Sequence, residues 1–245
     1  MPPLDPELAA AVPLAGEHQL RNAALAVTAV QLFLAALPER QLLPGVDWGQ
    51  LRALAHDREL LRAGLAATRW PGRLERLWPP AAAPSGPPPV AVPPGAAVWI
   101  DAAHNPEGVQ ALDRWLAAEL GPRPLTILFG AVAGKQVAQM GAPLRRAHKV
   151  VLTRPPSPRG LSPADLAAQL GATPGQPEGG SLQLAEDWLP ALHTALRSTL
   201  PGGLLLIYGS IFLIAAVRGF FYGEEVDDLQ VQDPGQPAAA DQSRQ

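Results

Sequence analysis

The first third of the chain is patterned as helix. Residues 17 to 37 place apolar side chains at helical spacing, and Pro38 ends the pattern. The residues that carry it are Leu20, Ala24, Val27, Val30, Leu34 and Leu37. Residues 51 to 67 predict a second helix, which the turn Trp70-Pro71-Gly72 ends. Eight prolines in the sixteen residues from 79 to 94 then predict an extended loop over residues 79–97, because proline donates no ladder hydrogen bond.

The rest of the chain alternates short apolar runs with helical patterns. The predicted strands are residues 98–100, 125–129, 149–152 and 204–208. The predicted helices are residues 107–120, 135–147, 162–170 and 185–199, and a further helix starts at Ile211. Such alternation is typical of an α/β fold with a mostly parallel sheet covered by helices.

One of these strands stops in polar residues just before a helix. The run Val98 to Pro106 reads as a buried strand followed by Asp101, His104 and Asn105, with Pro106 in the first helical turn. Ligands of open α/β sheets bind outside the carboxyl ends of the strands, so these side chains are candidates for a site. The alternative is that Asp101 or Asn105 caps the helix.

Composition narrows the function classes. The chain has 47% hydrophobic and 17% charged residues, which suits a core-forming protein. It has no cysteine, which excludes disulfides and zinc–thiolate sites and favours the cytoplasm. The net charge is −3, but six acids and one arginine lie in residues 224–245, so the first 223 residues carry about +2. We expect a disordered acidic tail and no nucleic-acid partner.

Residues 199 to 217 form an uncharged stretch of 19 residues, close to the length that spans a bilayer. Turn residues interrupt it at Pro201-Gly202-Gly203 and at Gly209-Ser210. The stretch therefore reads as a buried strand followed by a helix, and we expect no membrane partner.

Four separated segments, in this order, resemble one family. They are Gly16 to Ala26 (GEHQLRNAALA), Gly64 to Glu75 with the run WPGRLE, Asp101 to Pro106 (DAAHNP) and Gly209 to Leu213 (GSIFL). Together they resemble folylpolyglutamate synthase/dihydrofolate synthase, a relative of the Mur ligases, over residues 12 to 220. The resemblance implies a Rossmann-like C-terminal Mur ligase domain over residues 72–223. Residues 1–71 would then be a helical remnant of the central ATP-binding domain.

That family joins L-glutamate to the carboxyl group of a folate or dihydropteroate with ATP and Mg²⁺, through an acyl phosphate. The resemblance implies that Asn22 binds adenine, since an amide offers a donor and an acceptor to the N6/N7 edge. It implies that Arg73 is the catalytic, phosphate-contacting arginine, because a guanidinium offers parallel donors to phosphate. The alternative for Asn22 is an ordinary polar residue of a helix, and the alternative for Arg73 is an arginine on the surface.

Three more positions match. The resemblance assigns the ribose hydroxyls to Asp101, the nucleotide edge and the incoming glutamate to His104, and the glutamate to Ser210. For His104 the alternative is a local turn bond, and for Ser210 it is a strand-to-helix cap. Lys135 falls where the family has a Lys-Asp pair, but Gln136 replaces the aspartate. Ala102 replaces a usual glycine, which is harmless only where φ is negative.

The family's Gly-rich phosphate loop is missing from the sequence, which contains no G-x-x-x-x-G-K-[ST] run. We expect no metal ligands here, since the resemblance assigns the magnesium ligands and most of the folate site to a preceding region. We therefore expect little ligase activity from the chain alone, and an apolar face of helix 17–37 left exposed. It could instead be a non-catalytic glutamate- or nucleotide-binding remnant, or a subunit completed by a separately encoded N-terminal half. Otherwise we expect a monomer.

Overall fold

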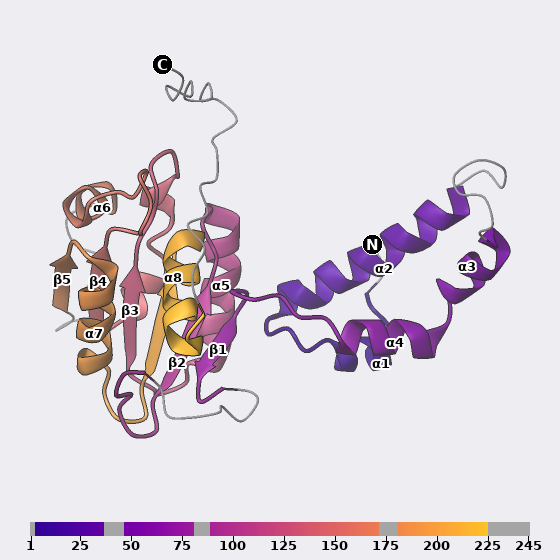
Figure 1. Ribbon diagram of the computed structural model, residues 1–245, viewed down its shortest axis with the longest axis horizontal. Coiled ribbons are helices and arrows are strands. Elements are labelled where there is room, and N and C mark those ends of the chain that lie inside the picture. The colour runs from indigo at the N-terminus through magenta and orange to yellow at the C-terminus, as the bar shows by residue number, and fades with distance from the viewer. Residues whose placement is uncertain (1–2, 37–46, 81–88, 172–180, 225–245) are drawn as a thin grey trace, which may run out of the picture.

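The computed structural model describes residues 3–36, 47–80, 89–171 and 181–224. Helices from the first third of the chain lie beside an α/β region formed by the rest, as Figure 1 shows. The predicted acidic tail, apart from Glu224, and residues 81–88 of the proline-rich loop lie outside the described residues.

A six-stranded sheet in the order β1-β2-β6-β3-β4-β5 forms the centre of the α/β region (Figure 1). Its strands are β1 (Glu75–Trp78), β2 (Ala97–Asp101), β3 (Leu125–Phe129), β4 (Lys149–Thr153), β5 (Ser181–Ala185) and β6 (Leu204–Tyr208). All pair in parallel except β1, which runs antiparallel to β2. The four predicted strands and the mostly parallel α/β class are confirmed. The edge strands β1 and β5 were not predicted.

Four helices cover the sheet: α5 (Pro106–Glu119), α6 (Pro163–Gln169), α7 (Trp188–Ser198) and α8 (Ile211–Tyr222). The predicted helix at 135–147 is wrong, because this segment forms two short 3-10 turns at Val137–Gln139 and Pro143–Arg146. Gly141 and Pro143 interrupt the pattern there, and proline cannot continue a helix. The helix predicted from residue 185 begins instead at Trp188, after β5.

The core lies on both faces of the sheet. Every residue of β3 and β6 is buried. Their alternate side chains enter two separate clusters, one with Leu116 of α5 and the other with Leu196 of α7. Parallel strands covered on both faces have this continuous apolar character, which is why the sequence predicts them well.

The uncharged stretch from residue 199 to 217 divides between β6 and the first half of α8. Among the described helices, none has the length and apolar character that crossing a bilayer requires. The strand-and-helix interpretation of this stretch is confirmed.

The N-terminal third folds into α1 (Pro6–Ala11), α2 (Glu17–Ala36), α3 (Trp48–Leu54) and α4 (Arg58–Ala66). The helix predicted at 17–37 is confirmed as α2. The single helix predicted at 51–67 is wrong, since α3 and α4 are separate. Asp57 separates them because its side chain accepts the Leu60 N–H at 2.9 Å and caps a new helix.

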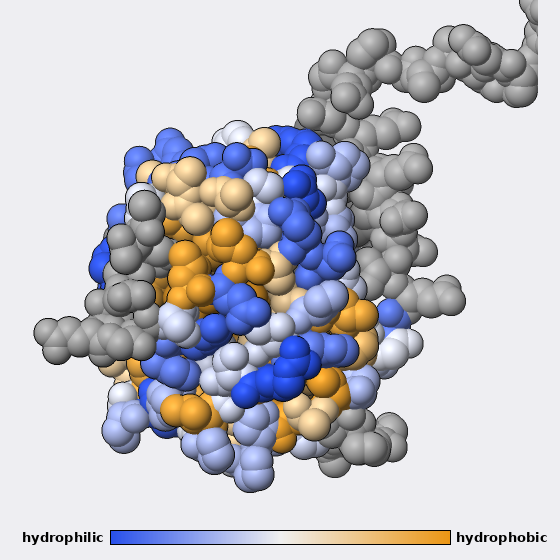
Figure 2. Space-filling model, turned by 90° about the vertical axis from the view of Figure 1, so that its left-hand side faces the viewer, coloured by the Kyte–Doolittle hydropathy of each residue, from blue (hydrophilic) through white to orange (hydrophobic). Residues whose placement is uncertain are grey.

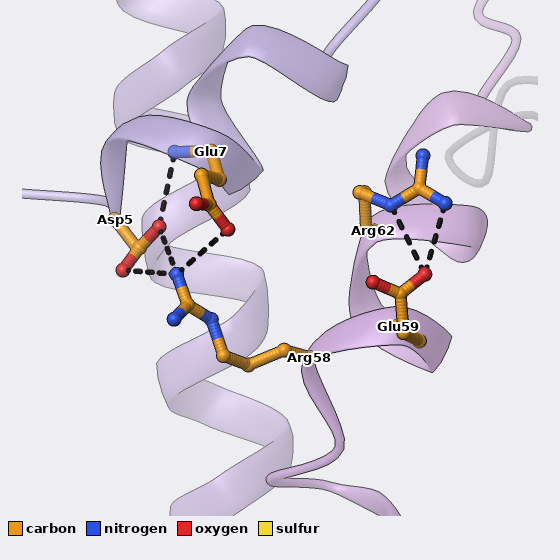
Figure 3. Close-up of polar contacts among 5 residues, drawn as sticks. All are labelled: Asp5, Glu7, Arg58, Glu59 and Arg62. Atoms are coloured by element: carbon orange, nitrogen blue, oxygen red, sulfur yellow. Dashed lines mark hydrogen bonds and ion pairs between the residues drawn. The ribbon is translucent and has the colours of Figure 1, made fainter.

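Ion pairs join the ends of this helical region (Figure 3). The Nη2 atom of Arg58 on α4 lies 2.8 Å and 2.9 Å from the carboxylate oxygens of Asp5, and 3.1 Å from Glu7 of α1. Arg62 pairs with Glu59 one turn along α4. These pairs are exposed to solvent, so each contributes little to stability.

The predicted exposure of the apolar stripe of α2 is wrong for most of its described residues: Ala24 is buried, Leu20, Val27 and Leu34 are half-buried, and Val30 alone is exposed. Other apolar residues of the helix do reach the surface. Leu25, Val30, Leu32 and Phe33 are 57%, 50%, 65% and 62% exposed. The helical region thus has little core of its own.

Apolar side chains also reach the surface around the edge strand β5. Leu184 is exposed there, and Figure 2 shows hydrophobic residues gathered on that side of the molecule.

Candidate functional site

Asp101 ends β2 and fastens a neighbouring turn to it. Its Oδ2 accepts the Leu74 N–H at 2.9 Å, and its Oδ1 accepts the Ala103 N–H at 2.7 Å. Leu74 adopts φ +44°, a left-handed conformation that costs a leucine about 1–2 kcal/mol. The helix cap is Asn105, whose Oδ1 accepts the Gly108 N–H. Asp101 therefore is not the cap, and its bonds stabilise a strained turn.

The Asp101 carboxyl group is buried. Burial raises its pKa, while the two backbone N–H bonds and the nearby Arg73 oppose that rise. Each carboxylate oxygen accepts one of these bonds and retains a second lone pair. The Asp101 side chain can therefore accept further hydrogen bonds from the hydroxyl groups of a ligand.

The turn from Trp70 to Arg73 packs against the end of β2. The Gly72 carbonyl accepts the Ala102 N–H at 2.7 Å, and the Gly72 N–H donates to Glu75 Oε2 at 2.7 Å. Gly72 has φ +75°, and an added Cβ would lie 3.0 Å from Ile214 of α8. These contacts direct the turn so that the Arg73 guanidinium lies 5.5 Å from the centre of the Trp70 ring.

Ala102 is compatible with this backbone. Leu74 is the only non-glycine residue with positive φ in the part of the chain that the structure describes. Alanine at position 102 therefore carries no left-handed strain, and the replacement of the family's glycine is harmless here.

Asn22 lies on the second turn of α2, with its amide held by a neighbour. Asn22 Nδ2 donates to Gln19 Oε1 at 3.1 Å, and Gln19 Nε2 lies 3.2 Å from His18 Nε2. Gln19 is buried, whereas Asn22 is exposed. The free N–H and the oxygen of the Asn22 amide therefore remain available to a ligand.

Asn22, Arg73 and Asp101 line one cavity of about 160 Å³. The other lining residues are His18, Gln19, Trp70, Gly108, Ala111 and Leu112. The structure thus brings together three of the five predicted site residues, which come from a helix, a turn and a strand end. A purine edge, a hydroxyl pair and an anion could each find a suitable partner on this wall.

His104 and Ser210 do not line that cavity. The Nδ1 of His104 lies 2.8 Å from the Ala102 carbonyl, which can only accept, so Nδ1 carries the proton and Nε2 is free to accept. The local turn bond proposed for His104 is thus present. Ser210 is the N-cap residue of α8, but its hydroxyl makes no capping bond; it is buried and has no hydrogen-bond partner among the described residues.

Lys135 follows β3 in a turn with Gly134 and does not line the cavity. Within residues 3–36, 47–80, 89–171 and 181–224, no three acidic or histidine side chains gather to hold a metal. Asp101 is the one carboxylate on the described cavity wall, and both its oxygens already accept N–H groups. This wall therefore does not fit a magnesium ion by itself.

Sequence reasoning missed His18, Gln19 and Trp70 as neighbours of the site. His18 also lines a second cavity of about 520 Å³, whose wall includes Trp99 and Trp115. His18 and Gln19 stand in the same segment as Asn22, so helical spacing could have indicated that all three lie near each other.

The comparison with known protein families assigns the chain to a class of protein. Residues 90–211 match the glutamate ligase domain of the Mur ligases, and the chain belongs to the Mur ligase family. Within it, the chain is 37% identical over 161 residues to the dihydrofolate synthase/folylpolyglutamate synthase of Mycobacterium tuberculosis, covering 65% of this chain and 27% of that protein. It is 31% identical to the folylpolyglutamate synthase of Lacticaseibacillus casei, covering 86% and 40%.

A solved structure agrees. Folylpolyglutamate synthase of M. tuberculosis complexed with ADP superposes with a TM-score of 0.63 at 30% identity, covering 86% of this chain and 41% of that one. The chain therefore spans less than half the length of the relatives it matches.

Proposed function

We propose that this chain supplies the nucleotide- and glutamate-facing part of an ATP-dependent ligase that adds glutamate to a folate or dihydropteroate through an acyl phosphate. The observation that carries the proposal is the shared cavity of Asn22, Arg73 and Asp101. The M. tuberculosis relative was solved with ADP, which supports a nucleotide as the ligand.

Each wall residue suits one part of that nucleotide. The Asn22 amide complements the N6/N7 edge of adenine. The lone pairs that Asp101 retains accept ribose hydroxyls, and Arg73 faces the phosphates, where a guanidinium stabilises the charge that moves during transfer. In this proposal residues 1–71 belong to the ATP-binding domain and residues 72–223 to the glutamate domain, so both contribute to one site.

Glutamate is assigned to the carboxyl edge of the sheet, beside the start of α8. His104 Nε2 can accept a hydrogen bond from the amine, and the unpaired Ser210 hydroxyl can donate to a carboxylate. Burial of an unpartnered hydroxyl costs about 1–3 kcal/mol, which a bound polar ligand would recover.

We further propose that magnesium and most folate contacts come from residues outside this chain, because the sequence has no phosphate loop and the described wall holds no metal site. The chain alone then binds nucleotide without ligase turnover. A non-catalytic nucleotide- or glutamate-binding domain is the second candidate, and the same missing loop favours it. Adding the N-terminal region of the L. casei relative separates the two, since only the first restores glutamate-dependent ADP release.

Calorimetric titration with ADP and AMP tests the nucleotide site. Arg73→Ala should weaken ADP binding about tenfold or more, the size of a lost charged hydrogen bond, and should leave AMP binding nearly unchanged. Arg76→Ala is the matched control, because Arg76 also lies over a tryptophan, Trp99, but does not line the cavity. Absence of ADP binding by the native chain, or equal losses in both variants, would contradict the proposal.

A further inference from the structure

Three polar side chains on the first turns of α2, those of His18, Gln19 and Asn22, are joined in series by hydrogen bonds. His18 Nε2 faces Gln19 Nε2 at 3.2 Å, and Gln19 Oε1 accepts from Asn22 Nδ2 at 3.1 Å. The two Gln19 contacts fix its amide, since Nε2 can only donate and Oε1 can only accept. Gln19 is 3% exposed, so bulk water reaches little of its side chain.

These hydrogen bonds between His18, Gln19 and Asn22 can all form only when the His18 ring is neutral. Nε2 must accept from Gln19, so Nδ1 carries the proton. Burial lowers the pKa of His18, and Arg73, Arg114 and Arg21 lower it further from a turn, from α5 and from α2. Glu17 and Glu119 are the acidic groups on the adjoining cavity wall.

The imidazole ring of His18 packs against the backbone of Gly16. A Cβ added to Gly16 would lie 2.7 Å from Cε1 and 2.8 Å from Nδ1 of His18. Gly16 also has φ +96°. The ring therefore packs directly on backbone, and its Nε2 is directed at Gln19.

We propose that Gln19 is a positioning residue that fixes the polarity of the Asn22 amide, so that the cleft selects a 6-aminopurine over a 6-oxopurine. This rests on the proposed nucleotide site. With one Nδ2 hydrogen given to Gln19, Asn22 presents its oxygen and its other N–H side by side. Adenine complements that pair with the N6 donor and the N7 acceptor, whereas a 6-oxopurine offers two acceptors and opposes its O6 to an oxygen.

Two substitutions at one position test the mechanism. Gln19→Met keeps the volume but removes both hydrogen bonds, which frees the Asn22 amide to turn. Gln19→Glu keeps an acceptor for Asn22 Nδ2 and offers its second oxygen to a protonated His18 Nε2. Gln31→Met is the matched control, because Gln31 also lies on α2 and its side chain donates a hydrogen bond to the Ala55 carbonyl, outside the cavity.

The measured quantity is the ratio of the dissociation constants of ITP and ATP, which differ at purine position 6 and N1. Gln19→Met should lower this ratio roughly five- to tenfold, the scale of one hydrogen bond, mainly by weakening ATP. Gln19→Glu and Gln31→Met should leave it within about twofold. An unchanged ratio in Gln19→Met, with ATP bound as tightly as by the native chain, would overturn the proposal.

Acid provides an independent readout. Protonating His18 replaces the Nε2 acceptor with a donor, so Gln19 must turn over and present its NH₂ group to Asn22. The ITP/ATP ratio of the native chain should therefore fall as the pH drops below the ordinary histidine pKa of 6.5, because the lowered pKa of His18 delays protonation. Gln19→Glu should not show this fall, since its carboxylate accepts from the protonated ring. A fall of equal size in that variant would contradict the mechanism.

The free protein separates this inference from the proposed function. In ¹⁵N NMR without nucleotide, His18 should show a protonated Nδ1 and a bare Nε2, and one Asn22 amide proton should be protected in the native chain and exposed in Gln19→Met. A His18 ring protonated at Nε2 at neutral pH would overturn the inference whether or not nucleotide binds. Correct NMR signatures without ATP binding would instead overturn the nucleotide function.

Discussion

The sheet region and the helical region differ in how they are stabilised. Every residue of β3 and β6 is buried between two layers of helix. In the helical region, α3 and α4 bury no residue, and α2 buries only Gln19 and Ala24. Yet Asn22, on α2, shares a cavity with Asp101 of the sheet. One wall of the site therefore has a deep core behind it, and the other has only its helix and exposed ion pairs.

The difference in burial predicts which region is stable by itself. Burial of apolar surface is the main source of stability, so the sheet region should fold on its own core. Leu32 and Phe33 of α2 are exposed, so this part of the helix gains little stability from burial. A ligand bound in the shared cavity would contact Asn22 of α2, so binding should stabilise this helix.

The largest expected effect is in the sheet region. Gly209→Ala should destabilise the protein by about 4 kcal/mol, because φ is +109° and the added Cβ would lie 2.5 Å from the Phe129 ring and 2.6 Å from the Gly130 carbonyl. Gly202→Ala is the control, since its φ of +71° is also positive but its Cβ would meet open space. Urea unfolding measures both, and equal losses would mean that packing at the end of β6 does not limit stability.

Hydrogen exchange compares the two regions directly. Amides of β3 and β6 should exchange only through global unfolding, and those of α3 and α4 through local opening that costs about 3 kcal/mol less. Peptide-level exchange with mass spectrometry measures the difference. Equal protection in both regions would show that the helices are stabilised by contacts other than those described.

Asp101→Asn should have an intermediate effect, about 2 kcal/mol, because an amide cannot accept both the Leu74 and the Ala103 N–H, and a buried donor is left unpaired. Asp113→Asn is the control, since Asp113 makes a partly exposed ion pair with Arg146. Thermal unfolding gives the stability of each variant. If the two lose the same amount, the strained turn at Leu74 is stabilised by something other than Asp101.

The smallest effect is expected on the exposed face of α2. The double substitution Leu32→Gln and Phe33→Gln should change the free energy of unfolding by about 0.5 kcal/mol or less, because both side chains are already exposed. Urea unfolding measures this change. A loss of several kcal/mol would mean that these side chains are buried in solution.

The sequence predicted those parts of the fold that have a strong period or a continuous apolar run. Strands β3 and β6 are such runs, and α2 and α5 follow an amphipathic pattern. The edge strand β5 was missed because Gln183 interrupts its apolar residues and only one neighbour pairs with it. The helix at 135–147 was predicted wrongly because apolar spacing was given more weight than Gly141 and Pro143.

For the site, motifs placed Asn22, Arg73 and Asp101, and the structure brings these three together. The roles assigned to them remain predictions. The spacing of Gln19 and Asn22 could have indicated their contact, but the burial of Gln19 could not be predicted, because a glutamine in an amphipathic helix is usually a surface residue. The strain at Leu74 could not be predicted either, because leucine rarely adopts a left-handed backbone conformation. The Asp101 carboxylate that accepts its N–H lies far away in the sequence.

Helix α8 joins two parts of the molecule that are far apart in the sequence. Ser210 precedes it, and Arg218, two turns on and about 12 Å further along the axis, binds Glu75, which in turn holds the Gly72 N–H. The helix therefore connects the carboxyl edge of the sheet, at Ser210, with the turn that carries Arg73. A substitution at Arg218, which lines neither described cavity, would remove one support of that turn although Arg218 and Arg73 lie far apart in the sequence.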